Sequence, residues 1–514
     1  MDAPERIRRF DRFARAPWGR TKSAKSSLRE NLLINALKHG LRWLKECPDG
    51  RFQRRYQDSL YRDAYDLLLL GRRYDTIETI FIYASRGLRK ITLDGIRVVP
   101  VPLVDAEDAR YYAYNRLVSA GIEPPPPSLE GRQMLAAIAD CLAVTDQGFR
   151  VKFNPKMVTE TMKAYRPVVE PRFQLPGDWR TTQYSFGDLK RFYSALSALA
   201  AIQFHARLAA KARGAPHLGF NDSVLAFGRR ELKARICRYS QLGDTAVIAI
   251  LEDLTYGSRG VDRPDPALQP IIPVSVDALL VSPSLILCLS PERNHCTLLN
   301  SIAVERQLYA GLVNQKENLM RQQILNAANA NWRRFSGEIP QRRDLPDIDL
   351  ALIDDQRDCV LILELKWFID PDEVREVLNK HEELKKGVNQ LKRLLAAFED
   401  GSRTVQRALN VPDTCRCQVA VVSQNWIGFR AVQDQAVPII SLRHLEGALR
   451  QAESLLSVAL WLNARKYLPT DGVHFRVVSG DVTIGDHSAL WYDIEPLISG
   501  TYDPLVSLPE ATER

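Results

Sequence analysis

The stretch PDIDLALIDDQRDCVLILELKWF, residues 346–368, decides the fold of its part of the chain. An apolar run begins directly after Asp349, and a second run, CVLILELKWF, begins at Cys359. The polar segment DDQRD, residues 354–358, separates them and is typical of a tight turn. Two short apolar runs joined by such a turn predict a pair of neighbouring, buried β-strands.

The second run is apolar except for Glu364 and Lys366. Successive side chains of a strand point to opposite faces, so residues two apart share a face. A turn centred near residue 356 places Asp349 roughly opposite residues 363–364 on the neighbouring strand. Burying a carboxylate and an ammonium is costly unless they pair or bind an ion. We therefore expect Asp349, Glu364 and Lys366 to form one functional site.

Carboxylates on adjacent strands suit Mg²⁺, which binds one or two carboxylates and keeps several waters. We expect Asp349, Glu364 and the backbone carbonyl of Leu365 to be the metal ligands, with Mn²⁺ as a substitute for Mg²⁺. Such a metal polarises a phosphodiester and activates a water for attack. Lys366 would orient or deprotonate that water and offset the developing charge.

These residues resemble the PD-(D/E)xK nuclease superfamily, which includes restriction endonucleases and many DNA repair nucleases. The pattern here is Asp349, 14 intervening residues, then Glu364-Leu365-Lys366, and the match covers about 150 residues. Asp347 completes the literal Pro346-Asp347 pair and is an alternative first ligand; Asp349 is preferred because the apolar run begins after it.

The resemblance implies two further catalytic residues. Many members of the superfamily carry a glutamate on the helix before the first motif strand, where Glu317 fits and Glu305 is the second choice. Members often carry a glutamine on the helix after the ExK motif, where Gln390 fits. Lys386, one turn before Gln390, is a candidate for a phosphate contact.

Outward from the motif, the pattern predicts a helix from residue 301, three strands, a helix near 371–398, two strands, and a helix from His444. This order indicates an α/β fold, a restriction-endonuclease-like mixed sheet flanked by helices.

The rest of the chain divides by pattern and composition. Residues 1–120 are expected to be a basic, mostly helical domain, and 121–300 a mixed α/β middle domain that begins with the linker GIEPPPPSLEG. In the middle domain, SVDALLVSPSLILCLS at 275–290 predicts two strands joined by a Ser-Pro turn. The nuclease-like domain occupies 301–450, and 451–514 is expected to add a helix and a β-hairpin.

Composition narrows the class of protein. The first 60 residues hold 15 Lys and Arg against 7 Asp and Glu, so they carry 15 − 7 = +8, which equals the net charge of the whole chain. A basic segment suggests a polyanionic partner, most simply nucleic acid. No apolar run approaches the ~18 residues of a membrane helix, and the N-terminus does not resemble a secretory signal. The eight cysteines form no CxxC pair. We therefore expect a cytoplasmic protein without a membrane partner or a zinc site.

Two hypotheses follow. The first is a Mg²⁺-dependent endonuclease that hydrolyses DNA, with duplex DNA as the expected substrate and with partner proteins or a homo-oligomer around it. An N-terminal region without a recognised family, followed by one nuclease domain, resembles the arrangement in bacterial defence effectors and mobile-element proteins. The second is a non-catalytic nucleic-acid-binding or assembly subunit with a nuclease-like fold. The intact Asp, Glu and Lys positions favour the enzyme, while the choice between DNA and RNA stays open.

Overall fold

The chain packs as two compact units in this computed structural model. The first unit takes its residues from Met1–Thr76 and Ile122–Leu312, and the second from Ile77–Gly121 and Val313–Arg514. The two units are defined by the contacts within each of them. They do not test the four-domain organisation expected from the sequence, which stays a prediction. The structure describes residues 37–41, 58–85, 90–94, 97–101, 106–119, 129–145, 148–215, 224–340, 342, 344–356, 358–368, 371, 374–484, 487–498 and 502–504.

The second unit contains a mixed five-stranded sheet with the strand order β12-β11-β10-β9-β8. β10 pairs in parallel with β11 and antiparallel with β9. The strands and the main helices from residue 301 follow the order expected from the sequence, whereas the short helices α14 and η3 were not expected. The elements of this part are α12 (Ala303–Ala327), β8 (Arg333–Gly337), β9 (Ile348–Asp354), β10 (Cys359–Lys366), α13 (Val374–Glu399), α14 (Thr404–Leu409), β11 (Arg416–Ser423), η3 (Arg430–Val432), β12 (Ile439–Ser441), α15 (Leu442–Gln451) and α16 (Leu455–Asn463).

A second sheet of the same unit joins segments from both ends of the chain, in the order β1-β2-β14-β13. Its strands are β1 (Lys90–Asp94), β2 (Arg97–Val101), β13 (Phe475–Ile484) and β14 (His487–Pro496), and helix α4 (Ala106–Ser119) follows β2. β13 and β14 pair antiparallel along their whole length in the alternating C-terminal segment.

β9 and β10 form the centre of the five-stranded sheet because both are apolar and buried on both faces. The turn between them is stabilised by Asp354, whose carboxylate accepts hydrogen bonds from the backbone N–H of Gln356 at 3.2 Å and of Leu455 at 3.1 Å. Asp358 closes the turn with a left-handed φ of 43°, which asparagine and aspartate tolerate better than most residues.

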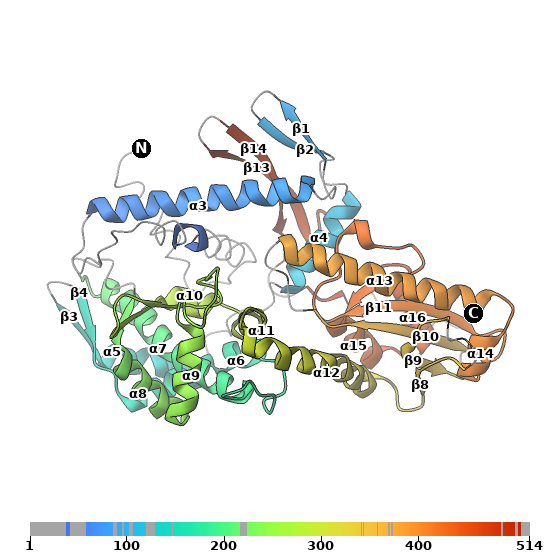
Figure 1. The fold of residues 1–514 in the computed structure, drawn as a ribbon, viewed down its shortest axis with the longest axis horizontal. Coiled ribbons are helices and arrows are strands. Elements are labelled where there is room, and N and C mark those ends of the chain that lie inside the picture. Colours follow the sequence, from blue (N-terminus) through green and yellow to red (C-terminus); the bar gives the residue numbers. More distant parts are fainter. Residues whose placement is uncertain are drawn as a thin grey trace. The chain divides into compact units, whose positions relative to one another are not determined.

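Helices cover both faces of this sheet. α13 packs against β10 and β11, and α16 packs against β9, β10 and β11. Figure 1 shows α13 lying along the sheet. Asp354, whose carboxylate accepts from the Leu455 N–H at the start of α16, is the register partner of Cys359, so α16 lies on the face of that cysteine. α13 lies on the other face, since Gly387 of α13 approaches the side chains of Glu364 and Lys366.

The first unit is mostly helical, with a two-stranded sheet of β3 and β4 and a three-stranded sheet in the order β5-β7-β6. The long helix α7 begins at a capping box formed by Ser185 and Asp188. The elements, with α3 shared between the units, are α3 (Asp58–Ser85), α5 (Leu129–Asp140), β3 (Leu142–Thr145), β4 (Gly148–Val151), α6 (Pro155–Val169), η1 (Glu170–Arg172), α7 (Phe186–Ala212), β5 (Leu225–Gly228), α8 (Arg229–Ser240), α9 (Asp244–Leu254), β6 (Ile271–Pro273), β7 (Ala278–Val281), α10 (Pro283–Cys288) and α11 (Pro291–Ser301).

One local expectation for this unit was wrong. The segment 275–290 contains one strand, β7, followed by helix α10, and not two strands. Pro283 is the first residue of that helix, and the Ser282 side chain accepts a hydrogen bond from the Leu285 N–H. A Ser-Pro pair starts a helix as readily as it makes a turn, because proline suits the first helical position.

Two expectations lie outside the described residues: most of the basic segment 1–60 and the prolines of the 121–131 linker. Among the helices that the structure describes, none is long and apolar enough to cross a membrane.

A buried charged network holds the first unit together. The Tyr184 hydroxyl donates to Asp253, and Arg259 Nε lies 3.0 Å from the same carboxylate. Arg259 also lies 3.8 Å from Glu305, which accepts a hydrogen bond from the Thr182 N–H at 3.1 Å. Asp253 and Glu305 are each 2% exposed. Burial raises the pKa of Asp253 to about 6. The Arg259 guanidinium therefore forms ion pairs with two buried carboxylates, those of Asp253 and Glu305.

We expect Arg259→Met to destabilise the first unit by about 3–5 kcal/mol, because it leaves two buried carboxylates without their cation. Arg191→Met is the matched control, since it breaks an exposed pair with Asp188 in the same unit and should cost less than about 1 kcal/mol. Urea unfolding followed by circular dichroism compares the two variants. Equal losses of stability would show that the Arg259 network does not stabilise the unit.

Candidate functional site

The pairing of β9 with β10 ends just before the charged residues. Leu363 is the last residue of β10 in register with β9, opposite Leu350, so Glu364 and Asp349 follow at the end of the ladder. There the Asp349 carboxylate accepts a hydrogen bond from the Leu365 N–H at 2.8 Å. Asp349 is half-buried and lies inside β9, whereas Asp347 is exposed and precedes the strand. The geometry therefore favours Asp349 over Asp347.

Glu364 and Lys366 share a face of β10 and form an ion pair. Lys366 Nζ lies 2.7 Å from Glu364 Oε1. The Lys366 side chain is 16% exposed and the Glu364 side chain is 3% exposed. Burial, with the nearby Asp349 carboxylate, raises the pKa of Glu364 to about 7 against the opposing effect of Lys366. Burial alone would lower the pKa of Lys366, but the Glu364 and Asp349 carboxylates outweigh it and the pKa is raised.

Glu317 of α12 adds a third carboxylate near this pair. Glu317 reaches solvent but is partly covered by its neighbours, and this partial burial raises its pKa. The Asp349 carboxylate raises the pKa further, whereas Lys366 lowers it. The preceding residue, Lys316, is 2% exposed and lies 5.6 Å from the centre of the Trp367 ring, just after β10. This contact fixes α12 beside the end of β10. The carboxylates of Glu364, Asp349 and Glu317 thus each raise the pKa of the Lys366 ammonium.

Gly387 lets α13 approach the charged residues closely. A Cβ atom at this position would lie 3.2 Å from Glu364 Cγ, 3.3 Å from Lys366 Cε and 3.4 Å from a methyl of Val421. Glycine in a helix interior is unfavourable by about 1 kcal/mol relative to alanine. The sequence signal for this role was an isolated glycine in an otherwise helical stretch, KKGVNQLKRLL, which often has a packing reason.

The other predicted residues are less closely engaged. Gln390 is half-buried on the same face of α13 as Gly387, and no hydrogen bond of the described residues joins it to the site. Lys386 is exposed and pairs with Glu383 at 2.8 Å. Glu305, the second choice for the helix glutamate, belongs to the network of the first unit and not to this site.

The loop after β11 is anchored beside the same end of the sheet. Asn115 of α4 donates to the Gly428 carbonyl at 2.9 Å and accepts from the Ile427 N–H at 2.9 Å. His381 Nε2 accepts from the Phe429 N–H at 3.2 Å, and burial lowers the pKa of that histidine to about 4, which keeps the ring neutral. Sequence reasoning missed these contacts because they join segments far apart in the chain.

Carboxylate and carbonyl oxygens at this end of β10 are the kind of ligand that a divalent cation such as Mg²⁺ binds. Among the residues that the structure describes, no group of three or more His, Cys, Asp or Glu side chains is arranged to hold a metal ion. The negative charge gathered here nevertheless suits a cation. Neighbouring carboxylates raise the pKa values of Glu364 and Glu317, and a bound cation would relieve that repulsion. The Leu365 carbonyl points to the same edge of β10 as its N–H, toward Asp349. Two carboxylates, a carbonyl and waters are a sufficient set for Mg²⁺.

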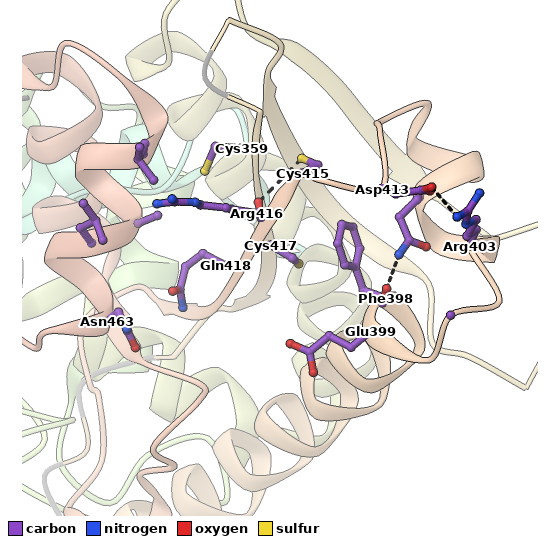
Figure 2. Close-up of a pocket in the computed structure, with 15 residues that line it drawn as sticks. Cys359, Phe398, Glu399, Arg403, Asp413, Cys415, Arg416, Cys417, Gln418 and Asn463 are labelled. Atoms are coloured by element: carbon purple, nitrogen blue, oxygen red, sulfur yellow. Dashed lines mark hydrogen bonds and ion pairs between the residues drawn. The ribbon is translucent and has the colours of Figure 1, made fainter. Parts of the chain in front are cut away.

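A pocket of about 650 Å³ lies at the opposite end of the sheet, where β10 and β11 begin. Figure 2 shows the side chains of Cys359, Cys415 and Cys417 there. Burial raises the pKa of Cys359 to about 12, that of Cys415 to about 11, and that of Cys417 well above its ordinary value. These raised pKa values keep the three thiols protonated at neutral pH, and protonated thiols are poor nucleophiles.

Comparison with known protein families, with curated proteins and with solved structures gave no match to this chain. The function must therefore be argued from the geometry of the site.

We expect Gly387→Ala to give no gain in stability, and a net loss of about 1 kcal/mol, because crowding against Glu364 and Lys366 offsets the better helix propensity of alanine. The matched control is Gly311→Ala in α12, where a Cβ atom meets nothing within 4 Å and alanine should stabilise by up to about 1 kcal/mol. Urea midpoints of the two variants test the difference. A stabilised Gly387→Ala protein would mean that α13 is not packed tightly on the charged pair.

Proposed function

We propose that the second unit is a metal-dependent nuclease of the PD-(D/E)xK type with a restriction-endonuclease-like fold. The observation that carries the proposal is the buried ion pair of Glu364 and Lys366, with Asp349 at the same end of the β9–β10 ladder and Glu317 acting electrostatically on Lys366. The mixed sheet, with α12 before the motif and α13 after it, supports the same reading.

Asp349, Glu364 and the Leu365 carbonyl would hold Mg²⁺, with Mn²⁺ as a substitute. When bound, the metal supplies Lewis-acid polarisation of the phosphodiester and activation of water. Lys366 favours the ionised form of Glu364, but burial and the Asp349 carboxylate raise the pKa of Glu364 to about 7, so metal binding would complete its ionisation at neutral pH.

Lys366 would act on the attacking water and on the charge that develops at phosphorus. Its raised pKa keeps it protonated at neutral pH, so it donates hydrogen bonds and stabilises negative charge rather than removing a proton itself. Glu317 is exposed and lies within electrostatic reach of Lys366, so it is the better candidate to accept the proton of that water.

DNA is the proposed substrate. A phosphodiester carries the negative charge that a metal and a buried ammonium recognise together, and the basic segment 1–60 would add non-specific affinity for the polyanionic backbone of DNA.

One observation favours a second candidate, a non-catalytic nucleic-acid-binding subunit. Asp349 is already bonded to the Leu365 N–H and Glu364 to Lys366, and the described residues hold no ready-made metal cluster. Such a subunit would bind DNA without cutting it.

We expect wild-type protein to cut DNA in Mg²⁺ or Mn²⁺ and to lose this activity in excess EDTA. Asp349→Asn, Glu364→Gln and Lys366→Met should each lower cleavage by about 10²-fold or more. Asn at 349 keeps an acceptor for the Leu365 N–H, which preserves the local fold. The assay uses supercoiled plasmid, linear duplex, single-stranded DNA and RNA, so it also identifies the substrate.

Lys392→Met is the matched control, because Lys392 is an exposed lysine of the same unit whose ammonium pairs with Asp434 at 2.8 Å. It should keep near wild-type cleavage. DNA binding without cleavage of any substrate, in either metal, would exclude the enzyme and leave the binding subunit. Metal-dependent cleavage that survives in all three site variants would place the active centre elsewhere.

A further inference from the structure

Ser423 lies beside Lys366 on the same face of the sheet. It is the last residue of β11 and the register partner of Lys366 in the parallel ladder, as Val421 is of Glu364. Gly387 of α13 approaches Glu364, Lys366 and Val421 together, so the even-numbered residues of β10 and their β11 partners share the α13 face. The Lys366 carbonyl accepts a hydrogen bond from the Gln424 N–H at 3.1 Å, which fixes the two strand ends side by side.

The Ser423 hydroxyl is buried and has no hydrogen-bond partner in the described part of the chain. The residue is 0% exposed, and its Oγ makes no hydrogen bond to any residue that the structure describes. Buried polar atoms without partners are uncommon, because losing hydration without compensation is unfavourable. Alanine would fill the same space without this penalty.

The next strand provides a direct comparison. Ser441 of β12 is the register partner of Ser423 and is also 0% exposed. Its hydroxyl is satisfied, at 2.8 Å from the Tyr114 hydroxyl. The two buried serines therefore differ: the Ser441 hydroxyl is hydrogen-bonded within the fold, whereas the Ser423 hydroxyl makes no hydrogen bond among the described residues.

We propose that Ser423 is a positioning residue for Lys366; this rests on the proposed nuclease function. An ammonium has three donors, and in this structure one of them meets Glu364. To act at a phosphodiester, the ammonium must turn toward the substrate. The adjacent Ser423 Oγ then accepts a hydrogen bond from Nζ and holds the lysine in its working position. Adjacent strands are about 4.8 Å apart, which brings this oxygen within reach of the flexible lysine.

The test compares stability with activity in Ser423→Ala. A purely structural view predicts that removing an unsatisfied hydroxyl leaves the thermal midpoint unchanged or raised and leaves cleavage unchanged. The positioning role also predicts a thermal midpoint that is unchanged or raised relative to wild type. It differs in predicting a kcat lowered about tenfold, with a KM for DNA close to wild type. Ser423→Thr, which keeps the hydroxyl, should recover part of the lost kcat.

Ser441→Ala is the matched control and should show the reverse pattern. It removes a bonded hydroxyl, so the thermal midpoint should fall while kcat per folded molecule stays near wild type. Wild-type kcat in Ser423→Ala, or a kcat that falls together with the thermal midpoint, would overturn the positioning role and leave the nuclease proposal intact. Absence of cleavage by the wild-type protein, with every substrate and both metals, would instead refute the nuclease and this inference with it.

Discussion

The ion pair between Glu364 and Lys366 is the constraint around which the second unit is arranged. Both side chains lie on the buried face of a central strand, 2.7 Å apart. A buried pair of this kind rarely stabilises a fold more than apolar residues of the same size, because the loss of hydration offsets the attraction. The nearby structure nevertheless preserves it: β9 leaves the ladder so that Asp349 can approach, and α13 carries a glycine where a larger residue would press on both charges. These features are easier to understand as support for chemistry than as support for stability.

The part of the site that follows from local rules was predictable. Alternation along a strand placed Glu364 and Lys366 on one face, and the length of the turn at 354–358 placed Asp349 opposite them. The same rules predicted the order of the strands and main helices from residue 301, because each of these has a clear apolar period, but they missed the short helices α14 and η3. Glu317 came from the resemblance to a nuclease family, and its electrostatic coupling to Asp349 and Lys366 is consistent with that placement.

The features that sequence reasoning missed depend on contacts between distant segments or on ambiguous short runs. The apolar run at 283–288 has no period that separates a strand from a buried helix, so the proline after Ser282 was read as a turn. Gly387 was visible only as a helix glycine, since its reason lies on β10. Gln390 was predicted on the helix after the ExK motif, and it lies on the same face of α13 as Gly387, but a shared face does not determine a contact. The Asn115 hydrogen bonds could not be inferred, because nothing near residue 115 points to the loop at 427–428.

Those Asn115 hydrogen bonds have a consequence for biosynthesis. They join residues 312 and 313 positions apart, and the first unit's residues 122–312 lie between them in the chain. A ribosome therefore releases α4 long before the loop that α4 anchors exists. The intervening unit has the contacts of a compact body and can form in that interval, whereas the edge of the sheet that bears Lys366 waits for the late segment. Interrupted translation would leave a chain with a finished first unit and an incomplete charged centre.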